Sequence, residues 1–296
     1  MKYELIEHTD TRLFQDAVID YLMRAEVECC AQIGIIARMS KDGYVPVSAG
    51  ELARPILWIV QHGDDIELVA IQTVRSKMLV TRGSTGAMEF LAQSLVKRRW
   101  DGESLIGVTP DVDSLVKAYA KVSWRSACLK VRLRVFQIEK VTWPAQSPGQ
   151  MRICQAADRQ ILARFIAGFE SDIGERSDED PLAFADRLIA EQRIFVWADP
   201  EPVAMAAWAG PTPNGVRVNF VYTAPEFRNR GYASNLVARL TDHLLSQGRK
   251  YCFLFTDQSN PTSNGIYQRL GYRPLSDSER WQFSAWQREK LNNRRY

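Results

Sequence analysis

The sequence has little imbalance of charge and no long apolar stretch. Its 296 residues include 38 lysines and arginines against 35 aspartates and glutamates, a formal charge of +3. This balance does not indicate a nucleic-acid-binding surface. No apolar run approaches the roughly 18 residues of a membrane-spanning helix, and the opening MKYELIEHTD lacks the apolar core of a signal peptide. We therefore expect a cytoplasmic protein with no membrane or nucleic-acid partner.

Cysteine and histidine are sparse and scattered. Two of the five cysteines are adjacent, Cys29 and Cys30, and three are isolated, Cys128, Cys154 and Cys252. The three histidines lie far apart, at His8, His62 and His243. These spacings match neither a metal site nor a disulfide framework. We expect no metal ion and no cysteine nucleophile.

The chain does contain enough apolar sequence for two domains. Its hydrophobic fraction is 46%, and its length fits two domains of ordinary size. The segment 144–150, PAQSPGQ, has the composition of a linker. It predicts one domain over 1–143 and another over 151–296. Strand and helix patterns follow one another in the same order in both halves, which predicts the α/β (α+β) class.

The most informative segment begins at Val216. Residues 216–223 alternate as in a strand, and Leu236, Leu240 and Leu244 have the spacing of an amphipathic helix. Between them lies Arg228-Asn229-Arg230-Gly231-Tyr232-Ala233. Gly231 allows a tight turn, and the unpaired N–H groups at the start of the helix carry positive potential. Such a turn binds phosphate oxygens, so residues 228–234 form a candidate phosphate site.

A second signal follows this helix. Tyr251–Thr256 has the pattern of a strand, and Asn260-Pro261 has the residue types that begin a helix. Tyr267 lies on this helix, and Gly271 supplies its C-terminal stop. Taken alone, Tyr267 is explained as a packed aromatic residue whose hydroxyl bonds to the backbone.

Together these segments resemble the GNAT superfamily of N-acetyltransferases. The likeness rests on the Arg-x-x-Gly-x-Ala turn at 228–233 and on Asn260, Tyr267 and Gly271-Tyr272. The whole chain resembles tandem-GNAT proteins, closely over 151–285 and weakly over 1–140. The resemblance implies two GNAT-like domains, each with a mixed, mostly antiparallel sheet flanked by helices. A Gly83–Gly86 turn without the motif makes the N-terminal domain a degenerate repeat that is expected to bind no cofactor.

The resemblance also implies acetyl-CoA as cosubstrate and direct transfer of its acetyl group to a primary amine. The implied cofactor contacts are Val221, Tyr222, Thr223, Arg228, Asn229, Arg230, Gly231, Tyr232, Ala233, Ser234, Asn260 and Tyr267. Tyr267 is the implied general acid, which stabilises or protonates the leaving thiolate. The chemistry is suitable, because a thiol with a pKa of about 8.5 is more acidic than a tyrosine with a pKa of about 10.

One position departs from the family pattern. Arg217 stands where many GNAT enzymes carry a glutamate, and a permanent cation is no base. Glu170 and Asp172 are alternative bases unless their acidic segment is a solvated loop, and a water relay needs no base. Two other functions stay open: a non-catalytic acyl-CoA sensor, and an acyltransferase with a longer acyl group. The sequence determines neither the acceptor nor the oligomeric state.

Overall fold

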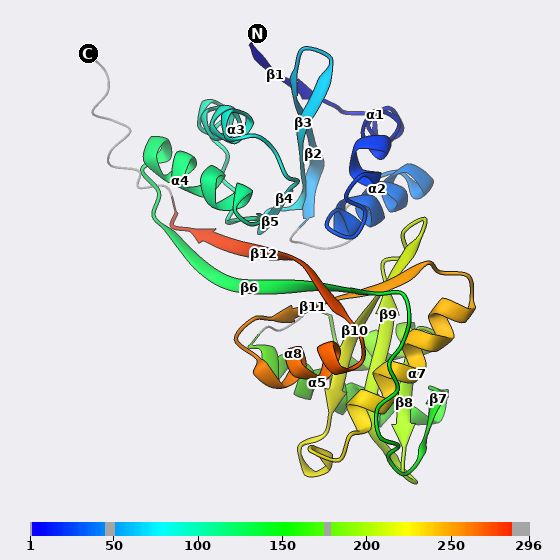
Figure 1. The fold of residues 1–296 in the computed structure, drawn as a ribbon. Coiled ribbons are helices and arrows are strands. Elements are labelled where there is room, and N and C mark those ends of the chain that lie inside the picture. Colours follow the sequence, from blue (N-terminus) through cyan, green and yellow to red (C-terminus); the bar gives the residue numbers. More distant parts are fainter. Residues whose placement is uncertain (1, 45–50, 175–178, 286–296) are drawn as a thin grey trace. The chain divides into compact units, whose positions relative to one another are not determined.

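The computed structural model describes residues 2–44, 51–174 and 179–285 (Figure 1). Contacts divide the chain into two compact units. The N-terminal unit contains Met1–Arg134, Asp257–Ser259 and Ser276–Tyr296, and the C-terminal unit contains Val135–Thr256 and Asn260–Leu275. In the described ranges, no helix is both long enough and apolar enough to span a bilayer.

The N-terminal unit follows the order strand, two helices, three strands, helix, strand, helix, strand. The bounds are β1 (Tyr3–Glu7), α1 (Thr11–Met23), α2 (Cys30–Asp42), β2 (Glu51–His62), β3 (Asp65–Val74), β4 (Lys77–Val80), α3 (Thr85–Lys97), β5 (Ser104–Val108), α4 (Asp111–Ser123) and β6 (Ala127–Ile138). The succession of strands and helices predicted for this half is present. The elements β1, α1 and α2 were not predicted from the sequence, although Asp10 caps α1 by accepting the N–H groups of Arg12 and Leu13.

The remaining elements begin near residue 150. They are β7 (Gln150–Ile153), the short helix η1 (Ala156–Asp158), α5 (Arg159–Ile173), α6 (Pro181–Ala190), β8 (Ile194–Ala198), β9 (Pro202–Ala209), β10 (Gly215–Thr223), η2 (Pro225–Phe227), α7 (Tyr232–Ser246), β11 (Tyr251–Asp257), α8 (Pro261–Arg269) and β12 (Arg273–Phe283). Every element predicted after the linker is found. The helix α5 ends at Gly174, whose φ of 67° suits a glycine stop.

The same order of elements therefore occurs twice, apart from the two short helices. Each unit contains a neighbouring pair of parallel strands, β4 with β5 and β10 with β11. The pairs β1–β2, β2–β3 and β3–β4 are antiparallel, as are β7–β8, β8–β9 and β9–β10. The predicted α/β class with a mixed, mostly antiparallel sheet is confirmed.

The last strand of the chain belongs mostly to the N-terminal unit. Residues Ser278–Gln282 of β12 pair antiparallel with Ser104–Val108 of β5. On the other side of β12, Arg132 of β6 donates to the buried carboxylate of Glu279 at 2.7 Å. The sheet order in this unit is β1-β2-β3-β4-β5-β12-β6. The compact units therefore do not coincide with the predicted domains 1–143 and 151–296, because β12 forms its ladder beside β5.

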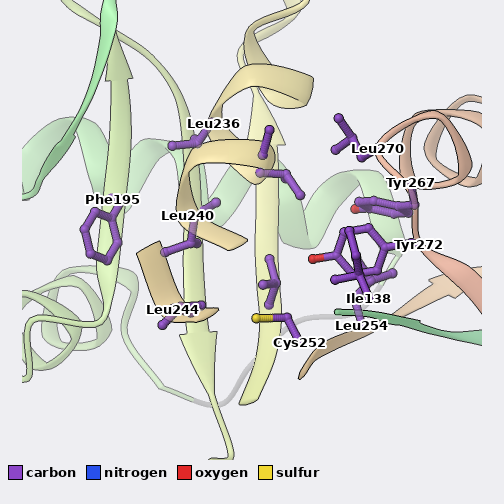
Figure 2. Close-up of a cluster of buried hydrophobic side chains, with 14 of the residues drawn as sticks. Ile138, Phe195, Leu236, Leu240, Leu244, Cys252, Leu254, Tyr267, Leu270 and Tyr272 are labelled. Atoms are coloured by element: carbon purple, nitrogen blue, oxygen red, sulfur yellow. The ribbon is translucent and has the colours of Figure 1, made fainter. Parts of the chain in front are cut away.

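In the C-terminal unit the sheet order is β6-β11-β10-β9-β8-β7, with residues 135–138 of β6 at one edge. One core fills the space between this sheet and the helices α7 and α8. Figure 2 shows Leu236, Leu240 and Leu244 of α7 lying between Phe195 of β8 and a group that includes Tyr267 and Tyr272. A second core lies under α5 and α6. The two cores place α7 and α8 on one face of the sheet and α5 on the other.

Candidate functional site

The strands β10 and β11 pair only at their beginnings. Their parallel ladder joins Gly215 to Tyr251, Val216 to Cys252 and Arg217 to Phe253. Beyond Arg217, β10 continues in its antiparallel ladder with β9 as far as Thr223. The edge of β10 that faces β11 is therefore without a strand partner over Val221–Thr223. The sequence resemblance implies cofactor contacts at these residues, and an unpaired strand edge can pair with a chain of amide groups.

A bulge in β10 sets the direction of the side chains next to this unpaired edge. The register with β9 shifts between Asn219 and Tyr222, and Phe220 has a φ of 51°. A positive φ is unfavourable for a bulky residue, at a cost of about 1–2 kcal/mol. Ring contacts at 5.1 Å with Phe169 of α5 and Phe184 of α6 hold Phe220 in place. The bulge thereby turns Asn219 and Phe220 toward the same face of the sheet.

The predicted phosphate turn is formed at the start of α7. Gly231 has a φ of 78° and precedes the first helical residue, Tyr232. The first helical hydrogen bond runs from the N–H of Asn235 to the carbonyl of Gly231 at 3.0 Å. The N–H groups of Tyr232, Ala233 and Ser234 therefore precede the first helical hydrogen bond, at the positive end of the helix dipole. This geometry suits a phosphate group.

The predicted linker supports this turn. The Ser147 hydroxyl is buried and donates to the carbonyl of Arg230 at 2.7 Å. The side-chain amide of Asn235 in α7 donates to the carbonyl of Ala145 at 2.9 Å and to Ser147 Oγ at 3.1 Å. Segment 144–150 thus lies packed on the C-terminal unit. Neither Ser147 nor Asn235 was predicted from the sequence. The signal that could have revealed them is the amide of Asn235 on the apolar side of α7.

The two arginines of the turn differ in their contacts. Arg228 donates from Nε to the carbonyl of Thr223 at 3.0 Å and from Nη2 to Asp172 at 2.7 Å. Its guanidinium therefore ties the end of β10 to the last turn of α5. Arg230 lies over the ring of Phe227 at 5.7 Å. Of the two, Arg228 already has a carboxylate partner.

Both alternative bases lie in the last turn of α5. Glu170 and Asp172 are helical, because α5 extends through Ile173. Asp172 forms the ion pair with Arg228. Within the acidic segment, residues 175–178 lie outside the described residues, whereas Glu179 pairs with Arg187 and Asp180 caps α6. In the described ranges, no three histidine, cysteine, aspartate or glutamate side chains are grouped as a metal site.

Tyr267 is a buried residue of α8. The helix begins as predicted, with the Asn260 side chain accepting the N–H of Ser263 at 3.0 Å. The Tyr267 ring contacts Phe136 and Tyr272, with ring centroids 6.3 and 5.8 Å apart. Tyr267 is only 8% exposed, and its hydroxyl has no hydrogen-bond partner in the described part of the chain. Burial raises the pKa of Tyr267 to about 12.

The neighbouring Tyr272 provides the contrast (Figure 2). Its hydroxyl forms a buried 2.7 Å hydrogen bond with the Thr241 hydroxyl of α7. Buried tyrosines usually satisfy their hydroxyl in this way. The structural explanation of a tyrosine tied to its surroundings therefore applies to Tyr272. It does not apply to Tyr267.

Comparison with known proteins identifies the fold. Residues 197–282 match the family model described as FR47-like protein. A GNAT-family acetyltransferase from Colwellia psychrerythraea is 14% identical, with 96% of this chain and 100% of that chain covered and a TM-score of 0.55. A GCN5-related N-acetyltransferase from Sphaerobacter thermophilus is 13% identical, with 95% of each chain covered and a TM-score of 0.62. This chain has the GNAT fold.

The likeness to a tandem-GNAT protein extends over both units. The tandem GNAT protein from the clavulanic acid biosynthesis pathway is 10% identical, with 96% of this chain and 98% of that chain covered and a TM-score of 0.55. The sequence resemblance to the GNAT superfamily is thus confirmed in the fold. The roles of individual site residues stay predictions.

The N-terminal GNAT-like unit fills its own counterpart of the turn with carboxylates. The N–H of Gly83 donates to Asp111 at 3.2 Å, and the Ser84 hydroxyl donates to Glu67 at 2.6 Å. Ser84 also caps α3 by accepting the N–H of Ala87. A phosphate group in this turn would meet two carboxylates at close range. The Gly83 N–H and the Ser84 hydroxyl thus already donate to carboxylates of the chain.

We expect one acetyl-CoA molecule to bind per chain. The turn at 228–234 has N–H groups ahead of the first helical bond, whereas the Gly83–Gly86 turn faces Asp111 and Glu67. Isothermal titration with acetyl-CoA measures the stoichiometry directly. A value near two would show that the N-terminal unit binds the cofactor in spite of its carboxylates.

Proposed function

We propose that the C-terminal unit is an acetyl-CoA-dependent N-acetyltransferase that transfers acetyl directly to a primary amine. The unpartnered hydroxyl of the buried Tyr267 carries this proposal. A hydroxyl that bonds to no other group of the described chain is free to donate to a partner that arrives during the reaction. The unpaired edge of β10 and the turn before α7 support the same assignment.

The residues present fit acetyl-CoA. The N–H groups of Tyr232, Ala233 and Ser234 are placed for its pyrophosphate, and Gly231 leaves the turn free of a side chain. The backbone of Val221 and Tyr222 has no strand partner on the side of β11, which leaves it available to the amides of pantetheine. Among the side chains that the resemblance implies, Asn260 caps α8 and so fixes the helix that carries Tyr267.

When bound, the thioester supplies the acetyl group: a carbon–nitrogen bond replaces the carbon–sulfur bond, and a proton from the amine ends on the sulfur. Tyr267 donates a hydrogen bond to the departing sulfur. With pKa values of about 12 for the phenol and about 8.5 for a thiol, complete proton transfer from the phenol is uphill by about 5 kcal/mol. Tyr267 therefore stabilises the thiolate and keeps its own proton.

This division of roles refines the general-acid assignment. A phenol with a pKa raised to about 12 stays protonated up to about pH 11, so it is a donor throughout that range. The charge on sulfur develops only in the transition state, where a positioned donor has its greatest effect. No covalent intermediate with the protein is required.

The test is a panel of amines, amino acids and peptides incubated with acetyl-CoA and with longer acyl-CoA thioesters. We expect CoA release, measured with a thiol reagent, for at least one acceptor and fastest with acetyl-CoA. Faster release with a longer thioester would identify the chain as a different acyltransferase. Tight acetyl-CoA binding with no release across the panel would contradict the enzyme proposal and favour an acyl-CoA sensor, as the replacement of a glutamate by Arg217 also does.

A further inference from the structure

Three polar side chains of β10 have an enclosed atom without a hydrogen bond in the described part of the chain: Thr223 and, closer to the start of the strand, Arg217 and Asn219. Arg217 is half-buried, and its Nε is enclosed without a hydrogen bond. Asn219 Oδ1 is likewise enclosed and unbonded. Neither side chain has an ion pair or hydrogen bond with any residue that the structure describes. Withdrawing a guanidinium from water without a partner is strongly unfavourable, so such groups are normally paired.

The structure describes eleven other arginines in this unit. Five of them form ion pairs with carboxylates: Arg152 with Asp158, Arg159 with Asp186, Arg187 with Glu179, Arg193 with Glu191, and Arg228 with Asp172. Arg217 is half-buried, as Arg152, Arg159 and Arg193 are, but it has no carboxylate in contact among the described residues. A missing partner at this position indicates one that comes from outside the chain.

Arg217 and Asn219 lie together beside the reacting region. Val216 and Val218 belong to the core under α7, so the alternation of the strand turns Arg217 and Asn219 to the opposite face. Their partners across the ladder on β9 are small, Ala209 and Ala207. Arg217 is also the last residue paired with β11, so this pair of side chains borders the point where the strands separate.

We propose that the acceptor is an amine that also carries a carboxylate, of the size of an amino acid, and that Arg217 binds this carboxylate while Asn219 accepts from its amine. This inference rests on the proposed function of the C-terminal unit. A guanidinium matches a carboxylate with two parallel hydrogen bonds. Side chains two residues apart on a strand emerge about 7 Å apart, which spans an amino acid.

The same cation disfavours the other acceptor classes and aids the chemistry. A diamine or polyamine would bring a second positive charge toward Arg217, which is repulsive. The fixed charge also favours the free base of the bound amine over its ammonium form. One proton of the ammonium then leaves to water before attack, and a second accompanies the sulfur as the nitrogen–carbon bond forms. This arrangement makes a glutamate at position 217 unnecessary.

The test compares each of a set of amino acids with its own α-amide as acceptor. For the wild-type chain we expect kcat/KM to be about 10- to 100-fold higher for the carboxylate than for the amide. In Arg217→Gln this preference should disappear, chiefly through KM, with the amides unaffected and acetyl-CoA affinity unchanged. Arg217→Lys should restore part of it. Arg164→Gln, the same change at an exposed arginine of α5, should keep the wild-type preference.

Amides that react as well as amino acids, or a preference that survives in Arg217→Gln, would overturn the inference and leave the proposed function standing. The absence of any turnover contradicts the proposed function instead. In that case calorimetry with CoA and N-acetylated amino acids decides the inference without turnover. Binding that Arg217→Gln weakens at least tenfold supports it, and binding that is absent or unchanged overturns it.

Discussion

Replacing Tyr267 with phenylalanine is expected to lower turnover by about 10²- to 10⁴-fold while acetyl-CoA affinity stays the same. The hydroxyl has no partner in the described chain, so its removal costs no internal hydrogen bond. We therefore expect the free energy of unfolding to stay within about 0.5 kcal/mol of the wild type. The assay is thiol release at saturating substrates, with the amine acceptor found in the panel, together with thermal unfolding.

Tyr272→Phe is the matched control. Both tyrosines are buried in one core and their rings are in contact, but the Tyr272 hydroxyl bonds to Thr241. Its loss leaves the Thr241 hydroxyl buried and unbonded, at a cost of about 1–3 kcal/mol in stability. Turnover in the folded protein should change little. If Tyr267→Phe loses stability and keeps turnover, as expected of Tyr272→Phe, Tyr267 is a structural residue.

The pH dependence of turnover provides a separate check on Tyr267. Burial raises its pKa to about 12, so the hydroxyl stays protonated from pH 6 to about pH 11. Loss of the Tyr267 proton should therefore produce no fall in turnover below about pH 11.

Gly231→Glu is expected to abolish acetyl-CoA binding. A side chain at this position enters the turn, and its first carbon would lie 2.7 Å from the Ser147 hydroxyl, which already bonds to the Arg230 carbonyl. The carboxylate also places a negative charge where the N–H groups of α7 would meet pyrophosphate. Titration calorimetry should detect no heat of binding at concentrations that saturate the wild type.

Gly248→Glu is the control that distinguishes loss of the phosphate site from the effect of backbone strain. Gly248 has a φ of 90°, so any side chain there is strained as at Gly231, but open space surrounds it. It follows the opposite end of α7. This variant should bind acetyl-CoA with wild-type affinity even where it is less stable. Equal affinity in folded Gly231→Glu would remove the turn from the cofactor site.

Most elements of the chain follow from local pattern. The period-two alternation of 216–223, the helical spacing of Leu236, Leu240 and Leu244, and the cap Asn260-Pro261 predict β10, α7 and α8 correctly. These signals are local because a strand, a helical face and a cap each involve residues close in sequence. They also carry the resemblance to the GNAT fold, which the comparisons confirm.

What depends on distant residues was not predictable in this way. The residue pattern of a strand does not reveal which strand it pairs with. The ladder between β12 and β5 was therefore missed. The composition of 144–150 indicated a linker, whereas Ser147 is buried against the turn because it has a specific partner in the Arg230 carbonyl. Pairings between segments far apart in sequence arise from packing, which leaves little local signal.

The sequence by itself determined the order of the elements, the glycine turn before α7 and the placement of Tyr267 on a short capped helix, because each depends on neighbouring residues. Only the tertiary structure decided which polar groups are satisfied. It gave a partner to Tyr272 and none to Tyr267, and it paired Arg228 but left Arg217 enclosed and unbonded. Hydrogen-bond satisfaction depends on groups brought together from distant segments, so residue type and spacing alone do not reveal it.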